Sequence, residues 1–147
     1  MTIALGWLLK VSPEELARVV VVPKGVTKIY DYVFSACNNI EEVILPEGVT
    51  FLGFRIFGES NGSSLVKLTL PDSLTRLSND TVCFLPQIEE IVVGKGLQQI
   101  DGNYFGNLKT IRFRGTIEEF KQMPWCEHSA IQGMTVICTN GTVKPTK

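Results

Sequence analysis

Apolar and polar positions along this chain follow a pattern that repeats several times. A block of the form apolar-Pro-x-Gly/Ser-apolar-Thr-x-apolar begins at Val22, Leu45 and Leu70, and a fourth copy at Val93 has glycine in place of proline and glutamine in place of threonine. The second position of the block falls at residues 23, 46, 71 and 94, at intervals of 23, 25 and 23 residues. A spacing within the range of about 20–50 residues is typical of solenoids, in which each repeat forms one turn of the chain.

Two further columns keep register with this block, which indicates true repeats. One column is mostly aromatic, and the other is a second block with apolar residues at its first, fourth and sixth positions. The aromatic column contains Phe34, Phe57, Val82 and Phe105, and the second block contains Ile40, Val43 and Leu45, then Leu65, Leu68 and Leu70, then Ile88, Ile91 and Val93, then Leu108, Ile111 and Phe113.

The polarity of each column predicts its place in a coil. Alternation of inward apolar and outward polar positions in the second block predicts a short strand. The proline that follows ends the strand, and the glycine or serine after it allows the chain to turn. The Val-Thr-x-Ile segment begins the opposite side, and the aromatic residue fills the interior. We expect about four coils with parallel strands stacked at roughly 4.8 Å, because one coil cannot cover its own apolar face. An insertion around Gly62–Ser64 lengthens the second copy, and we place it in a surface loop.

The combined motif L-x-x-V-x-L-P-x-x-V-T-x-I-x-x-x-x-F-x-x-C resembles the BspA-like leucine-rich repeats. The resemblance extends from Val19 to Arg114 and is closest between Ile40 and Phe57, while Val82 and Gly94 depart from the motif and only Cys37 fills its cysteine column. It implies an α/β-type repeat solenoid of the leucine-rich-repeat class. It also implies a binding role, often at cell surfaces, with no catalytic residues.

Segments suited to capping flank the repeats, because terminal coils would otherwise expose their core. We expect one domain with an N-terminal cap at residues 1–18, a solenoid at 19–114 and a C-terminal cap at 115–147. Ser12-Pro13-Glu14-Glu15 predicts a short helix over residues 13–18, and Thr116-Ile117-Glu118-Glu119 predicts another by the same capping-box spacing. Asn140-Gly141 predicts a hairpin turn after the second helix. We expect Trp7, Leu8 and Leu9 to cover the first coil and Trp125 the last.

Composition narrows the function and the location. The 147 residues are 44% hydrophobic and carry 14 basic against 15 acidic side chains, a net charge of −1. A chain of this length buries one sizeable core, and it has no basic field for nucleic acid. The apolar segment Met1–Lys10 lacks a basic start and is too short to span a bilayer. We therefore expect a cytoplasmic protein without a membrane span, with a secreted or cell-surface location as the alternative.

Candidate chemistry is sparse. Four cysteines (Cys37, Cys83, Cys126 and Cys138) are scattered, so reduced thiols are expected, with a Cys126–Cys138 disulfide as the alternative. His128 with Cys126 and Cys138 would supply only three zinc ligands and lacks the paired spacing of a structural site. Adjacent glutamates such as Glu89-Glu90 point to opposite faces of a strand and do not make an acid/base pair. We expect no enzyme, no cofactor and no metal.

The strand face is the expected binding site, since the register aligns its outward positions into rows. The partner is expected to be a protein, bound by an intracellular adaptor or inhibitor or, alternatively, by a fragment of a secreted or cell-surface adhesin. The loop from Glu59 to Ser64 and an end cap are alternative sites, and the chain is expected to be a monomer or a weak homodimer. The predicted rows are Val21, Ile44, Thr69, Val92 and Arg112, and beside them Val19, Glu42, Lys67, Glu90 and Thr110.

Overall fold

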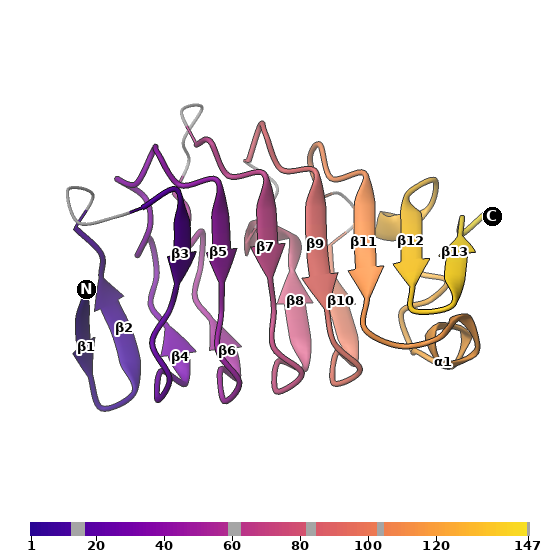
Figure 1. Ribbon diagram of the computed structural model, residues 1–147, viewed down its shortest axis with the longest axis horizontal. Coiled ribbons are helices and arrows are strands. Elements are labelled where there is room, and N and C mark those ends of the chain that lie inside the picture. The colour runs from indigo at the N-terminus through magenta and orange to yellow at the C-terminus, as the bar shows by residue number, and fades with distance from the viewer. Residues whose placement is uncertain (13–16, 59–62, 82–84, 103–104, 147) are drawn as a thin grey trace.

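A seven-stranded sheet runs along one face of the protein (Figure 1). The computed structural model describes residues 1–12, 17–58, 63–81, 85–102 and 105–146. Six strands of this sheet are parallel, and the last is antiparallel to its neighbour. In sheet order from the N-terminal end they are β3 (Val19–Val21), β5 (Glu42–Ile44), β7 (Lys67–Thr69), β9 (Glu90–Val93), β11 (Thr110–Phe113), β12 (Thr135–Cys138) and β13 (Gly141–Val143).

Shorter strands on the opposite side of the coils form two separate sheets. The first has the order β1-β2-β4-β6 and the second pairs β8 with β10, and Figure 1 shows β4, β6, β8 and β10 running against the direction of the main sheet. The main sheet is continuous where this side is interrupted, between β6 and β8. The strands are β1 (Thr2–Ala4), β2 (Trp7–Lys10), β4 (Lys28–Ile29), β6 (Phe51–Leu52), β8 (Arg76–Ser78) and β10 (Gln99–Asp101).

The expected columns form the core. Ile44 lies opposite Thr69 and Val93 opposite Phe113, so the columns ending at Leu45, Leu70 and Val93 stack coil on coil. Every apolar residue predicted for the second block is buried. Phe34, Phe57 and Phe105 of the aromatic column are also at most 4% exposed, whereas Val82 lies outside the described residues. Burial of these side chains, at about 1.5–3 kcal/mol each, is the main stabilising term.

The number of coils is larger than expected. Six parallel strands from β3 to β12 are joined by five successive turns of chain rather than about four. The additional strand is β12, which pairs in parallel with β11 from Thr110↔Thr135 to Arg112↔Ile137. Its coil was missed because the segment leading to it folds as α1 (Ile117–Lys121) and the 3-10 turn η3 (Ser129–Ile131), in place of a Val-Thr-x-Ile strand.

The C-terminal end contains a five-residue helix, α1, and a hairpin. The Thr116 side chain accepts a hydrogen bond from the Glu119 backbone N–H, and the Glu119 carboxylate accepts one from the Thr116 N–H, which completes the capping box of α1. The hairpin β12–β13 closes with Cys138 opposite Gly141, so its turn is centred one residue before the predicted Asn140-Gly141 pair. Trp125 is 2% exposed and donates from Nε1 to the Leu97 carbonyl at 2.9 Å, which anchors the cap on the last coils.

The N-terminal end differs from the helical cap that we expected. Its described part is the hairpin β1–β2, which joins the solenoid through parallel pairing of β2 with β4. The turn is the pair Leu5-Gly6, and both residues have a positive φ (50° and 79°), which matches the twist of hairpin strands. Leu8 is fully buried against the first coil. Residues 13–16 of the predicted helix lie outside the described residues, and residues 17 and 18 are not helical.

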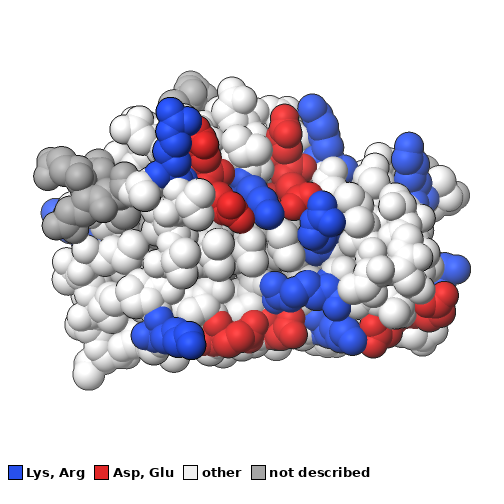
Figure 2. Space-filling model, viewed as in Figure 1, with Lys and Arg blue, Asp and Glu red and all other residues white. Residues whose placement is uncertain are grey.

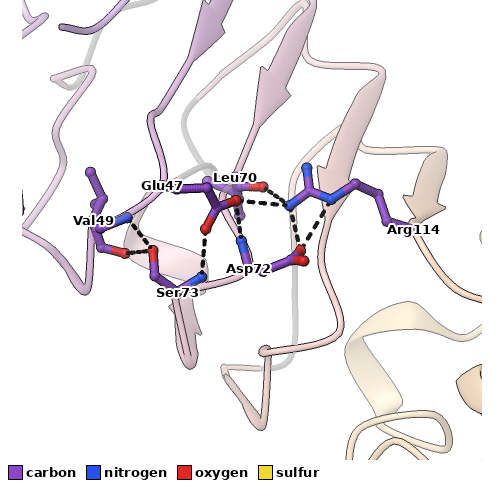
Figure 3. Close-up of polar contacts among 7 residues, drawn as sticks. Glu47, Val49, Leu70, Asp72, Ser73 and Arg114 are labelled. Atoms are coloured by element: carbon purple, nitrogen blue, oxygen red, sulfur yellow. Dashed lines mark hydrogen bonds and ion pairs between the residues drawn. The ribbon is translucent and has the colours of Figure 1, made fainter. Parts of the chain in front are cut away.

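The turns along the lower edge explain why the fourth copy has lost its proline, and Figure 3 shows the Asp72–Arg114 contact on which this depends. The Asp72 carboxylate accepts hydrogen bonds from Arg114 Nη2 at 2.7 Å and Nε at 3.1 Å, and Arg114 Nη2 also donates to the Leu70 carbonyl at 2.7 Å. A Cβ atom at Gly94 would overlap Asp72 Oδ1, and one at Gly96 would overlap the Asp72 backbone oxygen. The Asp72–Arg114 contact therefore requires glycine at position 94 for steric reasons. The loss of proline in the fourth copy is explained by this contact and is not a sign that the repeat has decayed.

Candidate functional site

The outward positions of the main sheet align in the two rows that the sequence predicts. Val21 lies beside Ile44, Ile44 beside Thr69, Thr69 beside Val92 and Val92 beside Arg112. The second row runs through Val19, Glu42, Lys67, Glu90 and Thr110 in the same register. We call the outward surface of β3, β5, β7, β9 and β11 the strand face, and it is turned towards the viewer in Figure 2.

Charged side chains on the strand face pair across neighbouring strands. Lys67 Nζ lies 3.5 Å from Glu42 and 3.6 Å from Glu90. Arg112 donates to both oxygens of Glu90 at 3.0 and 3.3 Å, and these hydrogen bonds raise the pKa of its guanidinium. Figure 2 shows the resulting alternation of red and blue across the strands. Opposite charges on facing strands contribute about 0.2–1 kcal/mol each, so this charge ladder stabilises the sheet whether or not it binds a partner.

The row predicted to be apolar is less exposed than expected. Val21 is 63% exposed, while Ile44 and Thr69 are half-buried and Val92 is only 7% exposed. Val92 is nevertheless not part of the core cluster. Arg112 lies beside Val92 in this row, and its guanidinium is held by Glu90 on the same strand as Val92. The exposed apolar surface of the strand face is therefore concentrated on β3, where Val19 is 48% exposed.

Exposed aromatic side chains lie on the opposite side of the coils, and sequence reasoning did not find them. Trp7 contacts Tyr30 and Phe51 with ring centroids 5.9 and 5.8 Å apart. Tyr32 and Phe54 form another pair at 5.9 Å. Tyr30, Tyr32, Phe51 and Phe54 are each 43–50% exposed. They were missed because their columns are not repeated: the position of Phe51 in its coil is Lys28, Arg76 and Gln99 in other coils.

The candidate thiol and imidazole groups do not form a site. Cys37, Cys126 and Cys138 are free thiols, and burial raises the pKa of Cys37 and of Cys138. Nδ1 of His128 accepts the Ala130 backbone N–H at 3.2 Å and so caps η3. Within the described ranges, no three His, Cys, Asp or Glu side chains are grouped so as to hold a metal ion. Cys83 and residues 59–62 of the alternative loop site lie outside these ranges.

Comparison with known sequences places the chain in a family. A family model described as BspA type leucine rich repeat region matches six copies over residues 16–132. The chain belongs to the BspA-type leucine-rich repeat family. The six BspA-type copies exceed the four that the sequence pattern predicts, and the matched range contains the parallel strands β3, β5, β7, β9 and β11 but ends before β12. No curated protein matches the sequence significantly.

A solved structure is similar in fold to this chain. It is the crystal structure of a leucine rich cell surface protein from Faecalibacterium prausnitzii A2-165, with a TM-score of 0.50 and 17% sequence identity. The match covers 80% of this chain and 37% of that protein. No helix in the described part of the chain is long and apolar enough to cross a membrane.

Proposed function

We propose that this chain is a protein-binding module of a secreted or cell-surface protein, and that it binds its partner through the strand face. Membership of the BspA-type family supports a scaffold role without catalysis. The name of the similar solved structure, a leucine rich cell surface protein, supports a location at the cell surface. The comparisons lend no support to the cytoplasmic adaptor or inhibitor that the sequence alone favoured. Residues 1–18, 19–114 and 115–147 are proposed as cap, solenoid and cap of one domain.

The observation that carries this proposal is the combination of an apolar edge with an ordered charge ladder on one face. Val19 and Val21 present exposed methyl groups on β3, at the N-terminal end of the main sheet. Beside them the charges of Glu42, Lys67 and Glu90 are held in place by cross-strand pairing. A partner that covers β3 gains burial of these valines, and the charge ladder sets its orientation, because charge complementarity mainly determines specificity and register.

The binding proposal is tested by placing charge on the apolar part of the strand face. The variant combines Val21→Glu with Ile44→Glu, which avoids the buried Val92, and the matched control is Leu5→Glu at the fully exposed hairpin turn. Each protein is immobilised and exposed to secreted and surface proteins of the native environment, and bound proteins are quantified by mass spectrometry. We expect a partner that wild type and Leu5→Glu retain and that the double variant loses at unchanged melting temperature. Equal retention by all three proteins would exclude the strand face.

The proposed location is tested separately on intact cells. An antibody against the chain is expected to label unpermeabilised cells or the culture medium, and protease treatment of the cells is expected to remove the cell-bound signal. A signal found only after permeabilisation would contradict the secreted or surface location and favour the intracellular adaptor.

A further inference from the structure

A groove of about 290 Å³ opens between β6 and β8, on the side of the coils opposite the strand face. Thr50, Phe51 and Leu52 line it from the β6 side, and Thr75, Arg76 and Ser78 line it from the β8 side. These two strands are neighbours in the repeat order but belong to different sheets, so each is an edge strand here. The groove is the place where the stacking of coils is interrupted.

The surrounding contacts fix the width of the groove. On the strand face the same two coils stay in register through pairing of β5 with β7. At the lower turn, Ser73 accepts a hydrogen bond from the Gly48 N–H at 2.9 Å and donates one to the Val49 carbonyl at 2.7 Å (Figure 3). The coils are therefore tied on two sides and separate only on the third. The two separated coils are those joined by the 25-residue interval from Pro46 to Pro71, whereas the other two intervals are 23 residues long.

Hydroxyl groups and one aromatic ring dominate the groove lining. Thr50, Thr75 and Ser78 bring hydroxyl groups. The Thr50 hydroxyl donates to the Thr27 carbonyl at 3.5 Å and keeps acceptor capacity, and the Ser78 oxygen accepts the Asp80 N–H at 3.2 Å and keeps its donor. Thr81, at the end of the 3-10 turn η2 (Asn79–Thr81), adds another hydroxyl from a residue that is 4% exposed. Phe51 is 47% exposed and lines the same groove. A hydrocarbon face beside several hydroxyls suits a ligand that alternates C–H surface with hydroxyl groups.

The one charged side chain in the groove lining is compensated by a neighbouring carboxylate. This residue, Arg76, is paired with the Asp101 carboxylate, and this hydrogen bond is the main cause that lowers the pKa of Asp101. Gln99 Nε2 donates to the other oxygen of Asp101 at 2.7 Å. Guanidinium, carboxylate and amide groups therefore form one polar cluster, which adjoins the groove through Arg76. A compensated cluster of this kind offers hydrogen bonds without attracting a charged ligand.

Aromatic rings continue the apolar surface beyond the groove. Phe51 is supported on its far side by Trp7, whose ring in turn contacts Tyr30. Lys28 Nζ lies 4.9 Å from the centre of the Trp7 ring, which fixes the ring further. The row across this side, taken from strand register, is therefore Trp7, Lys28 and Phe51 on one side of the groove and Arg76 and Gln99 on the other. Trp7 and Phe51 stand on β2 and β6, which are separated by β4, so the aromatic rings extend the surface over two strand spacings of about 4.8 Å each beyond the groove.

We propose that this groove binds a neutral oligosaccharide, independently of protein binding at the strand face. The Phe51 ring stacks on the C–H face of one sugar unit, and the Trp7–Tyr30 cluster extends the contact to a neighbouring unit. The hydroxyls of Thr75 and Ser78 and the cluster of Arg76, Gln99 and Asp101 hydrogen-bond to the sugar hydroxyls. No covalent step is involved.

Titration with defined sugars tests this assignment. The probes are maltohexaose, cellohexaose, xylohexaose, mannohexaose and chitohexaose, each titrated into the full chain and followed by calorimetry and by amide NMR shifts. We expect at least one hexasaccharide to bind, with shifts confined to β2, β4, β6, β8, β10 and their turns and none on the strand face. Phe51→Ala is expected to weaken binding about tenfold or more through loss of stacking. If none of the five probes binds at a concentration of about 10 mM, which corresponds to a binding free energy of about 3 kcal/mol, the proposal is overturned.

Matched variants separate the groove from its surroundings. Phe54→Ala removes an equally exposed ring that does not line the groove and is expected to leave affinity within about twofold. Thr75→Val keeps the side-chain shape and removes one hydroxyl, so it provides a second test if Phe51→Ala fails to fold. The Val21→Glu/Ile44→Glu variant is expected to bind sugar normally. Sugar binding that survives both groove variants, or a groove variant that loses a protein partner while no sugar binds, would overturn the assignment.

Discussion

Truncation of Phe57 to alanine is the strongest test of the packing described here. Phe57 is 4% exposed and stacks on Phe34 of the preceding coil, with ring centroids 5.4 Å apart and an interplanar angle of 19°. Loss of the buried ring removes about 1.5–3 kcal/mol of transfer free energy and about 0.5–1.5 kcal/mol of stacking. The unfilled space adds a further cost, so we expect Phe57→Ala to lower the free energy of unfolding by about 3–5 kcal/mol.

Urea denaturation followed by far-UV circular dichroism measures this loss. The free energies of wild type and variant are compared after confirming that the slope against urea is unchanged, because a changed slope would signal loss of two-state behaviour. Phe54→Ala is the matched control, since Phe54 lies three residues earlier and is 43% exposed; its expected loss is below about 1 kcal/mol. A loss below about 1 kcal/mol for Phe57→Ala, or equal losses for both variants, would refute the inward placement of the aromatic column.

Three further predictions concern the turns, the C-terminal cap and pH. Gly96→Ala is expected to cost about 3 kcal/mol in urea denaturation, because the new Cβ overlaps a backbone carbonyl of the preceding coil. Trp125→Phe is expected to cost about 1–3 kcal/mol by the same assay, because the buried Leu97 carbonyl loses its hydrogen-bond donor. The pKa of Glu119 is lowered, first by the Lys95 ammonium and then by the Thr116 N–H, so its stabilising contribution is present above its ordinary value of 4.5 and is lost as the pH falls below it. The stability difference between wild type and Glu119→Gln, measured from pH 7 to pH 3, should therefore shrink at the acidic end.

Each of the three predictions on Gly96, Trp125 and Glu119 has its own control variant. Gly25→Ala meets no atom within 4 Å and should cost only the penalty of its positive φ, about 1 kcal/mol; equal losses at both glycines would contradict the steric explanation. Trp7→Phe changes a half-exposed ring and should be nearly neutral, so a comparable loss there would show that Trp125 is not specially anchored. Lys95→Met should reduce the pH dependence attributed to Glu119, and an unchanged profile would remove Lys95 as its main cause.

The core of the solenoid was predictable because its columns repeat. Leu45, Leu70 and Val93 recur at equivalent positions, and side chains stacked in equivalent positions must satisfy the same burial requirement. The strand register followed from this, and with it both rows of the strand face. The burial of Val92 was not predictable, since the exposure of an outward position depends on the conformations of neighbouring side chains, which no periodic pattern encodes.

Features that occur once were missed or misjudged. In the fifth turn of chain, α1 and η3 replace the Val-Thr-x-Ile strand. β12 therefore pairs with β11 like the other parallel strands, but no repeat motif precedes it in the sequence. The N-terminal cap at residues 1–18 was predicted with a helix over residues 13–18 and without the hairpin, because Leu5 is an unusual residue for a turn position with positive φ. The groove between β6 and β8 arises from a local separation of coils, and only its longer repeat interval was visible in the sequence.

The contact between Asp72 and Arg114 bears on how this solenoid comes apart. In most stacked-repeat proteins each unit interacts only with its immediate neighbours, so the array can fray from an end one unit at a time. Here Arg114, which follows β11, donates hydrogen bonds to Asp72, 42 residues earlier in the turn after β7. Its side chain therefore reaches across the turn that follows β9. Detaching the unit that carries Arg114 thus also releases a unit two places away. Unravelling from the C-terminal end should consequently proceed in a block of three units, which hydrogen exchange would register as amides of β7, β9 and β11 opening with one common free energy.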